Sequence, residues 1–265
     1  MTSTTLADSD VAALGAVVYG AQTTATPIAK LTNEHPAMTV DDGYLVQNAV
    51  RATYLADGHR LVGWKAGLTS KAKMIQMGVD KPTVGFLTEQ MAVPEATAVD
   101  TTQLVHPRVE GEVAFVLKSD LPTSGCTIDD VVAATAYLLP AIEIIDSRYE
   151  AFKFDLQSVI ADNSSSSRFV VGTNAQRIDV IDRTNLGLAM VKNGETMTTG
   201  SSAAVMGDPA AAVAMVATVV GSLGARLTAG MVVLSGGITE AFAVQPGDHV
   251  SARFQQLGVV DVSFA

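Results

Sequence analysis

The sequence predicts an α+β protein in which a helical N-terminal part, residues 1–60, packs on a β-rich body, residues 61–265. The length suits one large domain, or one domain with a small appendage. Two observations predict this class. Apolar residues recur at helical spacing before residue 60, and from Leu61 onward short β-rich runs are separated by Gly, Pro and Asp.

Two helices are predicted in the N-terminal part. The segment 8–23 is the weaker one, and Pro27 breaks it because proline lacks a backbone donor. A capping box marks the start of the second helix, with Thr39 as the N-cap and Asp42 at position N3. This helix is expected to end at Gly58, because glycine favours the position that follows a helix C-cap.

The body begins with short runs of β-forming residues. The apolar runs 113–117 and 141–145 are dense enough to predict buried strands. Between them, Asp129 and Asp130 open a predicted helix, which is expected to stop before Pro140.

The C-terminal part of the body predicts one long helix and one hairpin. Asp208 and Pro209 are typical of an N-cap followed by proline at N1, and the apolar run after them ends near residues 221–224. Apolar residues then alternate over 250–254 and 260–264, which predicts a terminal hairpin.

The composition excludes several classes of protein. Hydrophobic residues make up 48% of the chain and charged residues 17%, which excludes a disordered chain. The net charge of −10 argues against nucleic acid or an anionic membrane as a partner. The single cysteine, Cys126, supports neither an internal disulfide nor a Cys-based metal site, so a reducing, cytoplasmic setting is the simplest interpretation.

Membrane and export signals are not expected in this sequence. No run reaches the roughly 18 apolar residues of a membrane span. The richest run, residues 210–220, predicts a buried helix. Residues 1–5 lack the basic and apolar regions of a secretory signal.

Three glutamates carry the strongest chemical signal. Glu110 and Glu112 precede a predicted strand, in which residues i and i+2 share a face with Cα atoms roughly 7 Å apart. Glu143 stands alone in an apolar run, where a carboxylate is rarely buried unpaired. Three carboxylates without Cys or His at metal spacing favour Mg²⁺ or Mn²⁺ over zinc. The alternative is a solvated strand face, with Glu143 paired to an arginine such as Arg148.

Three further segments place polar groups among apolar residues. Lys65 either pairs with a substrate carboxylate or extends to solvent from a strand end. The serine-rich run 162–168 predicts either a site loop or a linker. The amides of Gly236 and Gly237 either cradle a carboxylate or form a tight turn.

Several short motifs are spread along the chain. They are Lys65-x-Gly67-Leu68-Thr69-Ser70, Met77-Gly78-Val79-Asp80-x-Pro82, His106-Pro107-x-x-Glu110-x-Glu112, Glu143-x-Ile145-Asp146-Ser147-Arg148, Ala161-Asp162-Asn163 and Gly236-Gly237-Ile238-Thr239. Together they resemble the hydratase/decarboxylase family of meta-cleavage pathways, which belongs to the fumarylacetoacetate hydrolase superfamily. The resemblance extends from about residue 30 to the C-terminus and implies a mixed-sheet roll of the fumarylacetoacetate hydrolase C-terminal-like type.

Two features favour the decarboxylase activity of this family over its hydratase activity. The segment 146–156 is similar to the decarboxylase pattern S-R-Y-E-x-F-K-F-D-L. Thr83 stands where hydratases tend to carry an acid, and a missing acid is expected if no water has to be activated. The resemblance therefore implies metal-dependent decarboxylation of 2-oxo-3-hexenedioate to 2-hydroxypenta-2,4-dienoate and CO₂, in the breakdown of aromatic compounds. Trp64, Gly111 and Ser164 depart from the usual family pattern and bear on the shape of the pocket.

The resemblance also implies roles for single residues. Glu110, Glu112 and Glu143 would hold the Mg²⁺ or Mn²⁺ ion, and Lys65 would be the catalytic residue near the substrate's C1 carboxylate. The other substrate-binding residues that it implies are Asp162, Asn163, Ser165, Gly237 and Thr239.

The distal carboxylate of the substrate needs contacts of its own. Arg148 and Lys153 are expected to make them, with structural salt bridges as the alternative. An apolar cuff around this carboxylate is expected from Phe152, Phe154 and Leu156.

The expected partners are a small 2-oxo dicarboxylate substrate, further copies of the chain in a homo-oligomer, and the pathway's dienoate hydratase in a complex. Three alternatives stay open: a 2-hydroxypenta-2,4-dienoate hydratase, an acylpyruvate C–C hydrolase, and a non-catalytic accessory subunit of a partner hydratase. Retention of Lys65 and of all three glutamates argues against an inactive subunit.

Overall fold

The structure is a computed structural model that describes residues 5–70, 74–75, 81–95 and 97–265. The motif segment 77–80 and the start of the chain, residues 1–4, lie outside the described residues. The α-helices in the described part are α1 (Asp8–Thr23), α2 (Val40–Ala56), α4 (Ile128–Ala134), α5 (Leu156–Ala161) and α6 (Pro209–Ser222). The strands are β1 (Leu61–Gly67), β2 (Thr83–Thr88), β3 (Ala98–Val99), β4 (Arg108–Leu117), β5 (Thr135–Ile145), β6 (Ser166–Val171), β7 (Gly187–Lys192), β8 (Glu195–Ser201), β9 (Val232–Leu234), β10 (Phe242–Ala243), β11 (His249–Phe254) and β12 (Gly258–Phe264).

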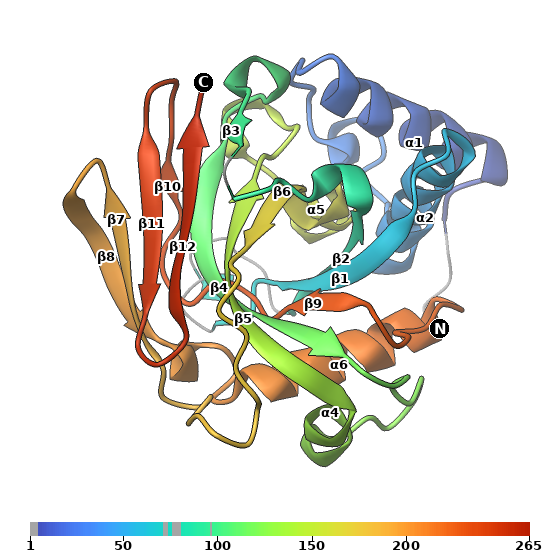
Figure 1. Ribbon diagram of the computed structural model, residues 1–265. Helices are drawn as coiled ribbons and strands as arrows, with labels where there is room; N and C mark the ends of the chain where they lie inside the picture. Colours follow the sequence, from blue (N-terminus) through green and yellow to red (C-terminus); the bar gives the residue numbers. More distant parts are fainter. Residues whose placement is uncertain (1–4, 71–73, 76–80, 96) are drawn as a thin grey trace.

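The strands form two sheets, and the predicted α+β class is confirmed (Figure 1). The seven-stranded sheet has the order β2-β1-β9-β4-β5-β6, with β10 paired to β4, and the five-stranded sheet has the order β3-β12-β11-β7-β8. The larger sheet is mixed, since β1 and β9 run parallel whereas β4 and β5 run antiparallel. The two sheets pack against each other through β4, where a Cβ added to Gly111 would lie 2.5 Å from Leu188 Cδ2 and 2.7 Å from Met190 Sδ.

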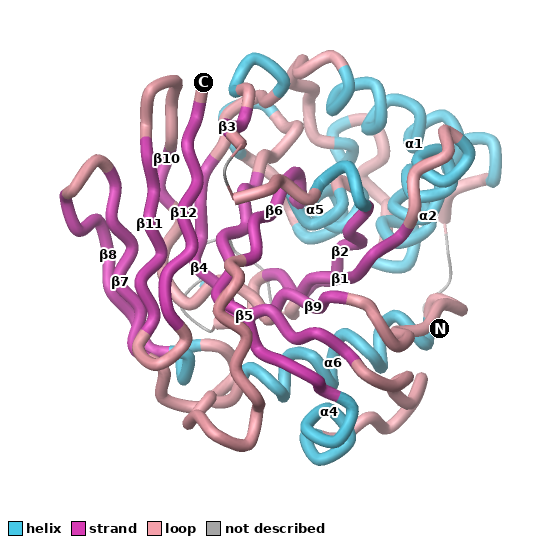
Figure 2. Tube along the Cα trace, in the orientation of Figure 1, coloured by secondary structure: helices cyan, strands magenta, loops and turns pink. Residues whose placement is uncertain are grey.

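The helical N-terminal part packs against the body (Figure 2). The predicted capping box is present, since Thr39 N donates to Asp42 Oδ2 at 2.8 Å and Asp42 N donates to Thr39 Oγ1 at 3.2 Å. From the buried face of α2, Gln47 Nε2 donates to the carbonyl oxygens of Val84 and Ile160, both at 2.8 Å. One hydrophobic core includes residues from both parts. The division near residue 60 stays a prediction.

The predicted helix after Asp129 does stop before Pro140, but proline is not what ends it. The helix α4 stops at Ala134, and β5 begins at Thr135 and continues through Pro140. Within this segment Thr135 and Tyr137 favour a strand, and residues 135–140 pair with β4. Proline removes only one donor from the ladder, and the Pro140 carbonyl still accepts a hydrogen bond from Gly172 N at 2.8 Å.

The predicted C-terminal elements are confirmed. The helix α6 starts at the N-cap Asp208, whose side chain accepts a hydrogen bond from Ala210 N at 2.9 Å. By length and composition the helical stretch Ser202–Ser222 could cross a membrane, but half of it is buried and α6 packs on β1 and β2, as a core helix does. The strands β11 and β12 form the expected terminal hairpin.

Candidate active site

The three glutamates lie on adjacent strands of the larger sheet. Glu110 and Glu143 are direct cross-strand neighbours of β4 and β5, and Glu112 follows two residues further along β4. All three side chains are buried. Like charges directly opposite each other in a sheet are destabilising, so this arrangement calls for positive charge close by.

Lys65 supplies one positive charge to this cluster. It projects from β1 and is only 3% exposed, so the lysine does not extend to solvent. Its Nζ atom lies 3.2 Å from Glu143 Oε1 and 3.3 Å from Glu143 Oε2. Gly67 keeps the space beside this ammonium open, because a Cβ there would clash with the hydroxyls of Thr83 and Ser164.

Glu112 is the most enclosed member of the cluster. Burial raises its pKa well above the ordinary value, and the nearby charges of Glu143 and Glu110 raise it further, whereas Lys65 lowers it. Gly236 N donates to Glu112 Oε2 at 2.6 Å. Gly236 has a φ of +104°, which favours glycine, so the predicted amide cradle binds a carboxylate of the protein itself.

The donor chemistry of the cluster fits a hard divalent cation. Glu112 Oε1 is buried without a hydrogen-bond partner among the described residues. Among the described residues, these three carboxylates gather around the Lys65 ammonium, and carboxylate oxygens are the ligands that suit Mg²⁺ or Mn²⁺. In the described part of the chain no three Asp, Glu, His or Cys side chains already have the spacing of a complete metal site. The fit therefore lies in the donor set and its charge, and not in preformed ligand geometry.

A cavity of about 230 Å³ opens beside the glutamates. Four residues that the sequence singled out line it, namely Lys65, Glu110, Glu143 and Ser165. Phe152 and Phe154 of the expected apolar cuff also line the cavity, but Leu156 does not.

The serine-rich run, predicted as either a site loop or a linker, forms a buried turn between α5 and β6 that borders the cavity. Asn163, Ser164 and Ser165 all have positive φ values of 50–57°, which is uncommon for residues other than glycine. Asn163 fixes this turn to β2, since its Oδ1 accepts from Phe86 N at 2.8 Å and its Nδ2 donates to Phe86 O at 3.0 Å. Ser164 Oγ is hydrogen-bonded to Thr83 Oγ1. Asn163 thus holds the turn in place, whereas Ser164 and Ser165 line the cavity.

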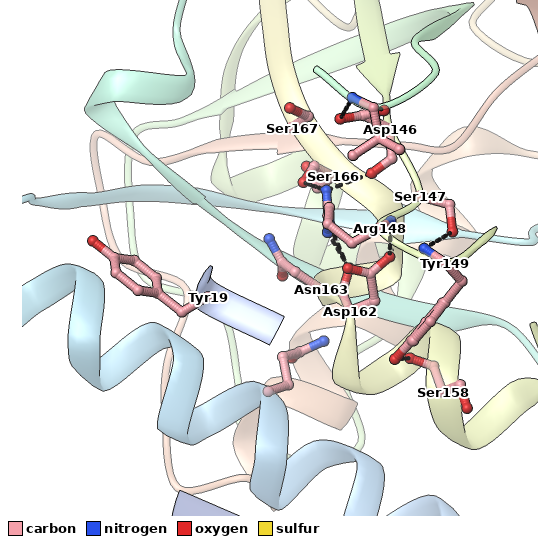
Figure 3. Close-up of polar contacts among 12 residues, drawn as sticks. Tyr19, Asp146, Ser147, Arg148, Tyr149, Ser158, Asp162, Asn163, Ser166 and Ser167 are labelled. Atoms are coloured by element: carbon pink, nitrogen blue, oxygen red, sulfur yellow. Dashed lines mark hydrogen bonds and ion pairs between the residues drawn. The ribbon is translucent and has the colours of Figure 1, made fainter. Parts of the chain in front are cut away.

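Arg148 is not among the lining residues of the cavity. It forms a salt bridge with Asp162, the alternative considered for it (Figure 3). The side chain is fully buried and its Nε donates to Asp162 Oδ1. Its Nη1 atom donates to the carbonyls of Asp146 at 2.6 Å and Ser166 at 3.0 Å, and its Nη2 donates to the carbonyl of Asp162. These bonds join the end of β5 to the turn and to β6, so Arg148 and Asp162 hold the wall together.

The remaining predicted substrate contacts are not part of the cavity lining. Lys153 is exposed, and Gly237 and Thr239 are buried next to the lining residue Glu240. Thr239 Oγ1 is buried and has no hydrogen-bond partner in the part of the chain that the structure describes.

Arg108 and Ser164 line the cavity, although the sequence reasoning did not assign them to the site. The signal for Arg108 was present, because it stands two residues before Glu110 and strand alternation puts both on one face. Ser164 belongs to the serine-rich run and was noted as a departure from the family pattern, but no role was predicted for it. Leu68 and Glu240 are further lining residues that were missed.

Known proteins resemble this chain over nearly its whole length. The family model of the fumarylacetoacetate (FAA) hydrolase C-terminal region matches residues 61–264. A 4-oxalocrotonate decarboxylase of Pseudomonas putida is 45% identical over 260 residues, which cover 98% of each chain. A 2-hydroxyhexa-2,4-dienoate hydratase of Comamonas testosteroni is 37% identical over 94% of this chain and 96% of its own. The solved structure of 4-oxalocrotonate decarboxylase from Pseudomonas putida G7, complexed with magnesium and adipate, matches with a TM-score of 0.96 and 44% identity, covering 99% of this chain and 100% of the other.

Proposed function

Because the chain belongs to the fumarylacetoacetate hydrolase family, we propose that it is a divalent-metal-dependent decarboxylase acting on 2-oxo-3-hexenedioate (4-oxalocrotonate). The products are 2-hydroxypenta-2,4-dienoate and CO₂. The observation that carries the proposal is the cavity in which the buried Lys65 meets Glu110 and Glu143. The identity of 45% to a decarboxylase, against 37% to a hydratase, favours carboxylate loss over hydration.

The site is suited to stabilise the charge that decarboxylation creates. As the C5–C6 bond breaks, its electron pair becomes the C4–C5 double bond, the C3–C4 pair moves to C2–C3, and the carbonyl pair moves to the C2 oxygen. A divalent cation held by Glu110, Glu112 and Glu143 supplies a Lewis acid for that charge. Lys65 Nζ holds a proton in the same region, and donation of this proton to the C2 oxygen gives the dienol product.

The opposite end of the cavity suits the loss of a charged group. Phe152 and Phe154 form an apolar wall there. The leaving carboxylate is charged in the ground state and becomes neutral CO₂, so an apolar surrounding favours the transition state over the bound substrate.

A dienoate hydratase is the second candidate, because relatives with that activity are also similar over nearly the whole chain. Hydration needs a group that activates water. Thr83 carries a hydroxyl that is bonded to Ser164 Oγ, and this does not favour the role of a base.

The test is turnover of 2-oxo-3-hexenedioate by the Mg²⁺-loaded protein, with and without EDTA, followed by CO₂ release and dienoate absorbance. CO₂ release that EDTA abolishes is the expected result, and Glu110→Ala should abolish it while the circular dichroism spectrum stays unchanged. Full activity of Glu110→Ala would overturn the metal assignment. Consumption of 2-hydroxypenta-2,4-dienoate without CO₂ release would establish the hydratase instead.

We further propose a cytoplasmic location, self-association, and a complex with the hydratase of the same pathway, which would receive the reactive dienol. Size-exclusion chromatography of the chain, alone and mixed with that hydratase, tests both associations. Elution of the chain as a monomer in both runs would contradict them.

A further inference from the structure

We propose that Arg108 binds the carboxylate at the far end of the dicarboxylate and thereby sets the preference for dicarboxylic substrates. This inference rests on the proposed function, because it assigns one end of that substrate to a residue. The observation that supports it is the spacing of the charged side chains along β4.

The face of β4 and β5 that borders the cavity changes charge along its length. Glu110 lies opposite Glu143, and two residues earlier on β4 Arg108 lies opposite Ile145. All four side chains line the cavity. The Cα atoms of Arg108 and Glu110 are roughly 7 Å apart by strand geometry. Five carbon–carbon bonds in a zigzag span about 6 Å, so a six-carbon dioate with C1 near the glutamates brings its C6 carboxylate to Arg108.

The Phe152 ring orients the Arg108 guanidinium, but no carboxylate among the described residues neutralises its charge. Its Cζ atom lies 4.3 Å from the centroid of the Phe152 ring, and the side chain is half-buried. Within the described ranges no carboxylate lies at ion-pair distance from it, although the exposed Glu240 also lines the cavity. A guanidinium that stacks through its face keeps its edge free for two parallel hydrogen bonds to a carboxylate.

The backbone around Phe152 supports this role. Ala151 and Phe152 have positive φ values of 55° and 59°, which are costly for residues other than glycine. In this conformation the Phe152 ring contacts both Arg108 and the Phe154 ring, and the neighbouring Lys153 is exposed outside the cavity lining. Arg148, the other cation expected at this end, is enclosed by Asp162.

The chemistry of the reaction decides which kinetic constant Arg108 controls. Its ion pair with the C6 carboxylate exists in the bound substrate and is lost as that carboxylate becomes CO₂. An interaction that is made in the bound substrate and lost in the transition state lowers KM and kcat together and leaves kcat/KM unchanged. Loss of Arg108 should therefore raise KM and kcat together and change kcat/KM little.

The experiment compares the binding of adipate and hexanoate, which differ by one carboxylate, to Mg²⁺-loaded protein by calorimetry. Arg108→Gln should weaken adipate binding about tenfold to a hundredfold, the value of a charged hydrogen-bonded pair, and leave hexanoate binding unchanged. The matched control Arg253→Gln removes a charge from an exposed position on β11 and should change neither. With the substrate, Arg108→Gln should raise KM at least tenfold while kcat/KM stays within about threefold.

Unchanged adipate affinity in Arg108→Gln, or an equal loss for both ligands, would overturn the inference, and so would a selective loss in Lys153→Gln alone. If Arg108→Gln does not fold, Arg108→Lys keeps the charge but not the planar fork, and selective weakening of adipate is again the expected result. A wild-type protein that releases no CO₂ but still prefers adipate through Arg108 would refute the proposed function and keep this inference.

Discussion

Lys65 is a buried ammonium whose partner is one of three clustered carboxylates. Its Nζ atom contacts Glu143 at 3.2 Å, and the side chain is almost fully enclosed. Removing one partner of a buried ion pair is costly, because the remaining charge stays buried and unpaired. Lys65, the proposed proton donor, is therefore also a structural counterion of Glu143.

We predict that Lys65→Met, which keeps the volume of the side chain, lowers the free energy of unfolding in EDTA by about 3–5 kcal/mol. It should also reduce kcat/KM at least a hundredfold, because the proton donor is lost. Urea denaturation with and without Mg²⁺ measures the first effect, and Mg²⁺ should restore part of the lost stability. Activity within twofold of the wild type would exclude Lys65 from the chemistry.

Arg148 gives a different prediction for activity: its loss should leave substrate binding unchanged, although the sequence predicted a substrate contact. Its guanidinium is fully buried and donates to Asp162 and to backbone carbonyls. Arg148→Met should lower the free energy of unfolding by about 3–5 kcal/mol, since Asp162 keeps a buried, uncompensated charge. The folded fraction, measured at low temperature, should keep the wild-type KM. A raised KM in a stable variant would contradict this.

At the residue scale the sequence predicted the type of site better than the role of each side chain. Glu110, Glu143 and Lys65 were found because charged groups in apolar runs need partners, and that rule is local. Arg148 and Asn163 also need polar partners, but these lie elsewhere in the chain. Arg148 donates to Ser166, and Asn163 accepts from Phe86. Which polar residue faces the substrate and which one holds the wall depends on tertiary contacts that no local pattern contains.

At the scale of elements, the two faces of β4 have different roles. Glu110 and Glu112 face the site, whereas Gly111 between them faces the five-stranded sheet. A Cβ at Gly111 would lie 2.5 Å from Leu188 Cδ2 and 2.7 Å from Met190 Sδ, too close for either contact. The departure from alanine at this position therefore reflects close packing of the two sheets.

We predict that Gly111→Ala destabilises the protein by about 1–3 kcal/mol, as overpacking of a core does. Leu188→Ala on the facing strand makes room for the added methyl group. The double variant should therefore lose less stability than the sum of the two single losses, and urea midpoints of the four proteins measure this coupling. Additive losses would mean that the two residues do not compete for space.

Helix starts were the most predictable elements, because a cap is local chemistry. The capping box at Thr39 and the N-cap at Asp208 are both present. The predicted helix does stop before Pro140, but its end at Ala134 was not predicted, since pairing with β4 draws residues 135–140 into a strand. The order of the strands could not be predicted from the sequence either. The strand β9 pairs with both β1 and β4, although it lies more than a hundred residues further along the chain.

At the scale of the whole molecule, the charge cluster couples cation binding to the stability of the fold. The three glutamates come from the adjacent strands β4 and β5 of the larger sheet, and Lys65 comes from a third, β1. Their mutual repulsion is a cost of folding when no cation is bound. Any ion that binds only the folded state therefore stabilises the entire molecule.

We predict that Mg²⁺ at about a hundred times its dissociation constant raises the Tm by roughly 5 °C relative to EDTA. Differential scanning fluorimetry measures this shift, and Ca²⁺ tests whether another hard cation replaces Mg²⁺. Glu112→Gln is the sharpest variant, because it keeps the shape of the side chain and removes one buried charge. In EDTA it should melt at the wild-type temperature or above, since repulsion from Glu143 and Glu110 is relieved.

The same variant should lose most of the Mg²⁺ shift, because the ligand that it removes is the one whose Oε1 has no hydrogen-bond partner among the described residues. A wild-type-sized shift in Glu112→Gln would show that the cation binds elsewhere and would remove Glu112 from the ligand set. Loss of the shift together with a lower Tm in EDTA would instead mean that Glu112 stabilises the fold through Gly236 N and not through a bound ion. The two temperatures together therefore separate the metal role of this carboxylate from its structural one.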